Sequence, residues 1–235
     1  MNVITRNIPN AITCLNVLAG TLAIILGSRG SEAAWGMKAY EWAYIFIGIA
    51  AVADFADGFA ARALHAYSNL GKELDSLCDL VSFGVAPAII VFQLVAEADV
   101  SPWAAWGSLL IAASGAVRLA RFNIDTRQAT SFIGLPIPAN AIFWIGYTAL
   151  LASGVDFLGC WYVFLPVLVV ECWLMNSGLG MFSLKFKSWG LKGNVSRWLL
   201  IVAAPVFVFT LGVGGLMWLI VFYVGMSLAR PGGKA

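Results

Sequence analysis

Apolar stretches fill almost the whole of this chain, with only short polar, glycine or proline breaks between them. A helix needs about 20 mostly apolar residues to cross a hydrocarbon core about 30 Å thick. Eight stretches approach or exceed that length, at approximately 8–27, 38–65, 70–98, 102–125, 137–153, 157–176, 196–211 and 213–230. The pattern predicts an all-α polytopic membrane protein. The fifth, seventh and eighth stretches are short, and the last two could instead form one re-entrant hairpin.

The composition excludes several other classes of protein. Hydrophobic residues make up 61% of the chain and charged residues 11%, whereas an average soluble domain has about 25% charged residues. A soluble enzyme of this size could not bury so much apolar surface. A disordered chain, a secreted disulfide scaffold and a nucleic-acid binder with a basic face are excluded as well.

The basic residues predict the orientation in the membrane, because lysine and arginine accumulate on the cytoplasmic side. With eight spans and a cytoplasmic N-terminus, only Arg29 and Lys38 lie on the far side. The other twelve lie on the cytoplasmic side: Arg6, Arg62, Lys72, Arg118, Arg121, Arg127, Lys185, Lys187, Lys192, Arg197, Arg230 and Lys234. We therefore expect both termini in the cytoplasm, and the first stretch is not expected to be a signal peptide because no cleavage site follows it.

The chain is predicted to form one domain with an accessory part. Residues 1–176 would be a six-helix membrane core. Residues 177–235 contain the longest polar connection, followed by a C-terminal helix pair. The sequence does not indicate what that pair does, nor the role of Glu171 within the sixth stretch.

Four aspartates lie in the second and third apolar stretches, where charged groups are costly unless they are paired, ligated or hydrated. Asp54 and Asp57 are three residues apart, and Asp75 and Asp79 are four apart. Each pair therefore lies on one face of its helix. Because the loop at about 65–70 is short, the two helices should be antiparallel neighbours. The four carboxylates would then meet near the cytoplasmic boundary.

Four like charges need compensation. Arg62 and Lys72 could supply part of it, and divalent cations would supply more. Oxygen ligands suit Mg²⁺ or Mn²⁺, and a carboxylate-bound metal pair can hold a diphosphate during phosphoryl transfer. Small residues on the same helices (Gly58, Ala61 and Gly71) leave space for a ligand. The alternatives are acids that reach water at a helix end, or the proton relay of an ion-coupled transporter.

The spacing D-x2-D-G-x2-A-R-x8-G-x3-D-x3-D between Asp54 and Asp79 resembles the signature of the CDP-alcohol phosphotransferase family. The resemblance implies a membrane-embedded, usually homodimeric enzyme that transfers a substituted phosphate from a CDP-linked donor to a hydroxyl and releases CMP. It implies that the four aspartates hold two metal ions and that Asp79 is the general base. It also implies a set of CDP-binding residues: Thr13, Asn16, Asp57, Gly58, Ala61, Arg62, Gly71 and Asp75.

Segments at 8–16, 81–87, 118–123 and 134–139 resemble the integral-membrane branch of that family whose donor is CDP-diacylglycerol and whose acceptor is L-serine. An arginine can bind a carboxylate through two hydrogen bonds, so Arg118 and Arg121 are candidates for the serine carboxylate. They could equally be anchors at the membrane interface. Asn123 and Ser82 could complete the acceptor pocket. Glycerol 3-phosphate, inositol phosphate or an archaeal-type lipid donor remain alternatives. The expected location is the cytoplasmic membrane of a prokaryote, with the site facing the cytoplasm.

Overall fold

The computed structural model describes residues 3–124, 132–182, 190 and 194–229. Within these residues the chain is almost entirely helical, which confirms the predicted all-α membrane protein. The α-helices are α1 (Val3–Gly27), α2 (Ala39–Ala63), α3 (Asn69–Asp79), α4 (Ala86–Glu97), α5 (Leu109–Ile124), α6 (Ile137–Ala152), α7 (Trp161–Asn176), α8 (Val195–Leu211) and α9 (Gly215–Leu228). Short 3₁₀ turns are η2 (Pro102–Ser108), η4 (Asp156–Gly159) and η5 (Gly212–Gly214).

Two pairs of very short strands support the connections between helices. Strands β1 (Ala33–Ala34) and β2 (Met37–Lys38) form an antiparallel hairpin between α1 and α2. Strand β3 (Phe132–Ile133) pairs antiparallel with β4 (Gly180–Met181), with Ile133 opposite Gly180. The second pair joins the segment before α6 to the segment after α7.

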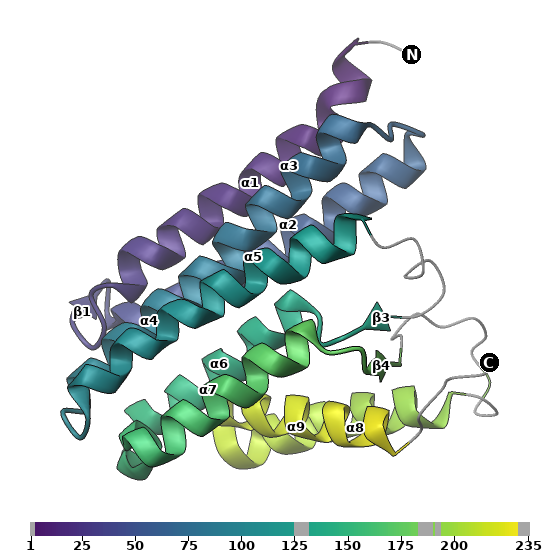
Figure 1. Cartoon of the computed structure of the whole chain (residues 1–235). Helices are drawn as coiled ribbons and strands as arrows, with labels where there is room; N and C mark the ends of the chain where they lie inside the picture. The colour runs from purple at the N-terminus through teal and green to yellow at the C-terminus, as the bar shows by residue number, and fades with distance from the viewer. Residues whose placement is uncertain (1–2, 125–131, 183–189, 191–193, 230–235) are drawn as a thin grey trace.

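Successive helices run back and forth along one direction of the molecule (Figure 1). Helices α1 to α5 form one group, α6 and α7 lie beside it, and the α8–α9 pair packs on the far side of α6 (Figure 1). Helix α1 begins and α9 ends at the same end of the bundle. This is the arrangement that an even number of passages produces.

The lengths of the helical segments follow the predicted spans. Five segments of the described chain are long and apolar enough to cross a membrane: Asn7–Gly27, Ala39–Ala63, Asn69–Glu97, Pro102–Ile124 and Val195–Leu228. Helices α6 and α7, with 16 residues each, are shorter. The last of the five segments is divided at Gly212, whose φ is +60°, so α8 and α9 fold back on each other, with Phe207 against Phe222.

The third span is one passage built from α3, a π-helical turn η1 (Leu80–Val85) and α4. Pro87 has no N–H to continue the regular ladder. The N–H of Ala86 bonds to the carbonyl of Val81, five residues earlier. Turns of this kind often mark functional sites in proteins, and this one begins directly after Asp79.

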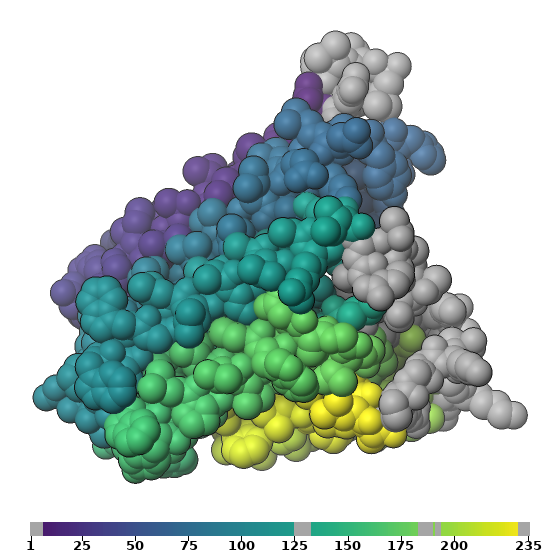
Figure 2. All heavy atoms as spheres, in the orientation of Figure 1, coloured from purple at the N-terminus to yellow at the C-terminus, as the bar shows by residue number. Residues whose placement is uncertain are grey.

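Close packing between α1 and the third span fixes their relative position. A side chain at Gly20 would collide with Ser82, and one at Gly27 would collide with Ile90. Small residues let two helix backbones approach each other in this way. The outer surface is apolar instead, with Val52, Phe55 and Phe209 at least 70% exposed, as expected for a surface that faces lipid. Figure 2 shows the helical groups packed together.

Candidate active site

Three of the four aspartates expected to converge, two from α2 and one from α3, come together. One carboxylate oxygen from each of Asp54, Asp57 and Asp75 lies within 4.8 Å of the other two. Asp57 is buried, and the other two are partly buried. Asp79, one helical turn beyond Asp75, is also buried. We call these four residues the aspartate cluster.

Helix α1 contributes two polar side chains to the same place. The hydroxyl of Thr13 donates a hydrogen bond of 2.5 Å to Asp57 Oδ2. The amide nitrogen of Asn16 donates one of 3.0 Å to Asp79 Oδ1. Both residues are buried. The two contacts join α1 to α2 and α3, and each orients a single carboxylate.

Local sequence explains how α3 presents its aspartates. The Ser68 side chain accepts a hydrogen bond from the N–H of Gly71, which caps the start of the helix. The spacing of four residues then directs Asp75 and Asp79 to the same face. After Asp79, the π turn places Ser82 against α1, where its hydroxyl donates to the carbonyl of Asn16 at 3.0 Å. Ser82 is thereby tied to the helix that supports Asp79.

The small residues of the motif have different surroundings. A side chain at Gly58 would meet only the end of Arg62, so the space beside α2 is open there. A side chain at Gly71 would press on Asn10 of α1 and on the capping Ser68. Gly71 therefore allows α1 to approach α3, while Gly58 leaves room. Ala61 lies one turn further along α2 and is partly exposed.

Protein cations do not neutralise the cluster in the part of the chain that the structure describes. There, the only ion pair joins Arg29 to Glu32, at the opposite end of the bundle. Arg62 is exposed. Lys72 instead donates to the carbonyl of Asn123, at 2.9 Å. The compensation that the sequence suggested from these two residues is therefore not seen as ion pairs.

The acceptor candidates divide into two groups. Asn123, near the end of α5, donates to the Ser76 hydroxyl at 3.0 Å and so reaches α3 beside Asp75. Ser82 is engaged with α1, as described above. The other group is the two arginines of α5, which contact the segment before α6 and the end of α7.

Arg118 is buried, and its Nε donates to the carbonyl of Leu135 at 2.9 Å. Its guanidinium lies 5.8 Å from the ring centre of Phe122. Within the described ranges no hydrogen bond is formed by its two Nη atoms, which leaves them available. Arg121 is exposed and donates from Nη1 to the carbonyl of Asn176 at 3.0 Å. Arg121 therefore fastens the end of α5 to the end of α7.

Sequence reasoning missed Ser76, which links α3 to α5. It is the residue next to Asp75, and only the approach of α5 distinguishes it from any other serine on a helix. Glu171 of α7 is almost completely buried, and its Oε2 has no hydrogen-bond partner among the described residues. Arg127, Lys185, Lys187, Lys192, Arg230 and Lys234, on which the predicted orientation partly depends, lie outside the described residues.

The aspartate cluster has the chemistry of a divalent-cation site. Its donors are all carboxylate oxygens, which are the ligands that Mg²⁺ and Mn²⁺ prefer. Buried carboxylates without a protein cation also favour an added positive charge. The donor set therefore fits such an ion.

Fold and site together define an integral membrane protein of antiparallel helices with an acidic site between its first three spans. Comparison with known proteins narrows this class. Residues 6–176 match the family model of CDP-alcohol phosphatidyltransferases, and the chain belongs to that family. The resemblance found in the aspartate motif is thus confirmed over almost three quarters of the sequence.

Similar curated proteins carry the name CDP-diacylglycerol–serine O-phosphatidyltransferase. One from Methanocaldococcus jannaschii is 37% identical over 146 residues, which is 62% of each chain. One from Mycobacterium leprae is 35% identical over 150 residues, or 61% of this chain and 47% of the relative. One from Helicobacter pylori is 32% identical over 188 residues, or 78% of this chain and 75% of the relative. The chain thus spans less than two thirds of the first two relatives.

Proposed function

We propose that this protein is a phosphatidylserine synthase, which transfers the phosphatidyl group of CDP-diacylglycerol to the hydroxyl of L-serine and releases CMP. The observation that carries the proposal is the aspartate cluster, whose spacing matches the family motif and three of whose side chains (Asp54, Asp57 and Asp75) meet in space. The names of the similar proteins support serine as the acceptor.

Two Mg²⁺ or Mn²⁺ ions would be held by Asp54, Asp57, Asp75 and Asp79. When bound, such ions neutralise a diphosphate and stabilise the charge that develops on the leaving phosphate. Thr13 supports this role, because its hydrogen bond fixes the orientation of the Asp57 carboxylate within the cluster.

The cytidine nucleotide would lie against the open face of α2. Gly58 offers space there, and Ala61 and Arg62 follow on the next turn. Arg62 is exposed and unpaired with any acid in the described residues, so it can approach a phosphate. Gly71, Asp57 and Asp75 would border the nucleotide from the other side, with Thr13 and Asn16 contributed by α1.

Asp79 would act as the general base. The amide nitrogen of Asn16 donates a hydrogen bond of 3.0 Å to Asp79 Oδ1, so Asp79 Oδ2 would accept the proton from the serine hydroxyl. The serine oxygen then bonds to the phosphorus that carries diacylglycerol, and the bond from that phosphorus to the oxygen of CMP breaks. A positioned base accelerates a reaction of this kind by a factor of about 10²–10⁴.

The serine carboxylate would be bound by Arg118. Its Nε is held by the carbonyl of Leu135, which orients the guanidinium and leaves the Nη atoms for a carboxylate. Arg121 would have a smaller part, because it already fastens α5 to α7. Asn123 and Ser82 would contribute indirectly, through their contacts with Ser76 and Asn16.

The same proposal covers the setting of the enzyme. It would be a homodimer in the cytoplasmic membrane of a prokaryote, with the aspartate cluster facing the cytoplasm. Arg62 and Lys72 lie at one end of the bundle, at the α2–α3 turn, and Arg29 and Lys38 lie at the other (Figure 1), which supports this orientation. Residues 1–176 would be the catalytic core, and 177–235 the accessory part.

The test is an acceptor panel. Purified protein receives CDP-diacylglycerol, Mn²⁺ or Mg²⁺, and one radiolabelled alcohol at a time: L-serine, glycerol 3-phosphate or inositol phosphate. We expect CMP release and a labelled lipid only with serine. Turnover with another alcohol and none with serine would show that the other alcohol is the acceptor. A metal-independent ion flux without CMP release would point to the transporter instead.

A further inference from the structure

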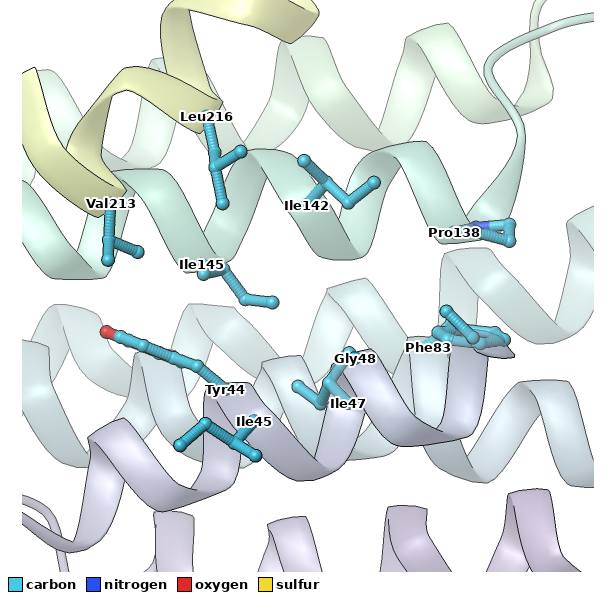
Figure 3. A pocket seen from close by; sticks show the side chains of 11 residues that line it. Tyr44, Ile45, Ile47, Gly48, Phe83, Pro138, Ile142, Ile145, Val213 and Leu216 are labelled. Atoms are coloured by element: carbon cyan, nitrogen blue, oxygen red, sulfur yellow. The ribbon is translucent and has the colours of Figure 1, made fainter. Parts of the chain in front are cut away.

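An apolar pocket lies between α2, η1, α6 and the C-terminal helix pair. Its volume is about 330 Å³, and its walls include Gly48, Ala51, Phe83, Ile142, Val213 and Leu216. In Figure 3 the side chains of α2 and α6 face each other across it, while Val213 and Leu216 close it from η5 and α9.

The pocket continues the helix faces that carry the aspartate cluster. Residues 51, 47 and 44 lie three, seven and ten positions before Asp54, and therefore on the same face of α2. Phe83 follows Asp79 by four residues on the third span. Phe83 lies at one end of the pocket and Tyr44 at the other (Figure 3). The pocket thus leads away from the aspartates along the direction of the helices.

The length suits one lipid chain. Ten residues of helix from Asp54 to Tyr44 cover about 15 Å at 1.5 Å per residue. A hydrocarbon core is about 30 Å thick, and each leaflet fills about half of it. An acyl chain that starts at the level of the aspartates would reach Tyr44.

The lining requires an apolar occupant. The hydroxyls of Tyr44 and Thr148 bond to each other at 2.8 Å at the far end. Thr148 is also bonded to the carbonyl of Trp144 at 2.7 Å. These polar groups are therefore satisfied within the protein. Ile45 and Val213 are each more than 40% exposed, so the pocket opens between them toward the surrounding lipid.

The C-terminal helix pair forms a fixed wall of this pocket. Helix α9 packs so closely on α6 that a side chain at Gly146 would collide with the backbone of Leu216 and Met217. Val213 and Leu216 lie beyond residue 176, outside the part of the chain that matches the family model. This wall is thus a feature of this chain in addition to its family core.

We infer that the C-terminal helix pair completes a binding pocket for one acyl chain of the lipid donor and limits the chain length that the enzyme accepts. The inference rests on the proposed function, since it takes CDP-diacylglycerol as the lipid whose head group lies at the aspartate cluster. Val213 and Leu216 are the specificity-determining residues, together with Gly48 on the opposite wall.

The first test measures binding without turnover. A CDP-diacylglycerol with a photoreactive group near the end of one palmitoyl chain is irradiated with the full-length protein, and the labelled peptides are identified. We expect labelling of the peptides that contain Tyr44 and Leu216. Unlabelled dipalmitoyl CDP-diacylglycerol should compete, whereas dipalmitoyl phosphatidylglycerol should not. Labelling elsewhere, or equal competition by both lipids, would show only surrounding bilayer lipid and would overturn the inference.

The second test fills the pocket. A side chain at Gly48 would meet no atom within 4 Å, so Gly48→Leu should fold and occupy the space. It should lower kcat/KM about tenfold or more for the dipalmitoyl donor, because overfilling a packed site is costly. The dioctanoyl donor should be affected by less than about threefold.

Gly225→Leu is the matched control. Gly225 is an exposed glycine of α9 that also has nothing within 4 Å of an added side chain, and it does not line the pocket. It should leave both donors unchanged. Equal loss for both chain lengths in Gly48→Leu, or no loss at all, would refute the pocket while leaving the proposed reaction intact. Specific labelling without any serine-dependent release of CMP would instead refute the proposed reaction.

Discussion

Replacing Asp75 with asparagine should inactivate the enzyme and yet stabilise its metal-free form. Oxygens of Asp54, Asp57 and Asp75 lie within 4.8 Å of one another. At an effective dielectric constant of about 20, two unit charges at that distance repel by about 3.5 kcal/mol. Neutralising Asp75 removes two such repulsions, about 7 kcal/mol if all three carboxylates carry a full charge and lie 4.8 Å apart.

The measured gain should be smaller, because water and bound protons relieve most of the repulsion. We expect about 1–2 kcal/mol, which corresponds to about 2–8 °C in Tm for a chain of this size. A metal that binds only the folded protein adds about 2.7 kcal/mol at about 100 times its Kd. That addition should appear in the native protein and be much reduced in Asp75→Asn, which has lost a ligand.

The assay is thermal unfolding of the detergent-solubilised protein, first with a chelator and then with increasing Mn²⁺ or Mg²⁺. Glu73→Gln is the matched control, because it removes one acid from the same helix but lies outside the cluster. The control should keep the metal-dependent rise in Tm. A lower metal-free Tm in Asp75→Asn, together with an equal metal-dependent rise in both proteins, would refute the assignment of the cluster as a metal site.

Four further substitutions test individual roles. Asp79→Asn should lower kcat by at least about a hundredfold without affecting membrane insertion, and normal activity would remove it as the base. Arg118→Ala should raise the KM for serine about tenfold and leave the KM for the lipid nearly unchanged, whereas Arg121→Ala should change both KM values little. If Arg118→Ala changes the two KM values equally, Arg118 has a structural role and does not bind serine. Thr13→Val should raise the metal concentration for half-maximal activity several-fold, because Asp57 loses its hydrogen bond; an unchanged metal requirement would contradict this.

The spans and the aspartate cluster could be predicted because both follow from local spacing. Apolar runs of sufficient length define a crossing, and two acid pairs on helices joined by a short turn must lie near each other. The structure places α2 to Ala63 and α3 from Asn69, so the turn is as short as expected. The proximity of the two acid pairs therefore follows from this turn alone and does not depend on how more distant helices pack.

Contacts between distant helices could not be predicted in the same way. The hydrogen bond from Asn16 to Asp79, and that from Arg118 to Leu135, depend on how helices rotate and slide against each other. Periodicity fixes which face a residue occupies but not which helix that face meets. The apolar pocket is a further case, because Leu216 and Gly48 line the same pocket only through the packing of α9 on α6.

The central claim, metal-dependent transfer of a phosphatidyl group to serine, is tested most directly by the stoichiometry of its products. Purified protein is given CDP-diacylglycerol and radiolabelled L-serine, and CMP and labelled phosphatidylserine are measured together with and without a chelator. We predict that one CMP appears for each phosphatidylserine and that the chelator abolishes both. CMP release without labelled lipid, or lipid synthesis that continues after the metal is removed, would contradict the account.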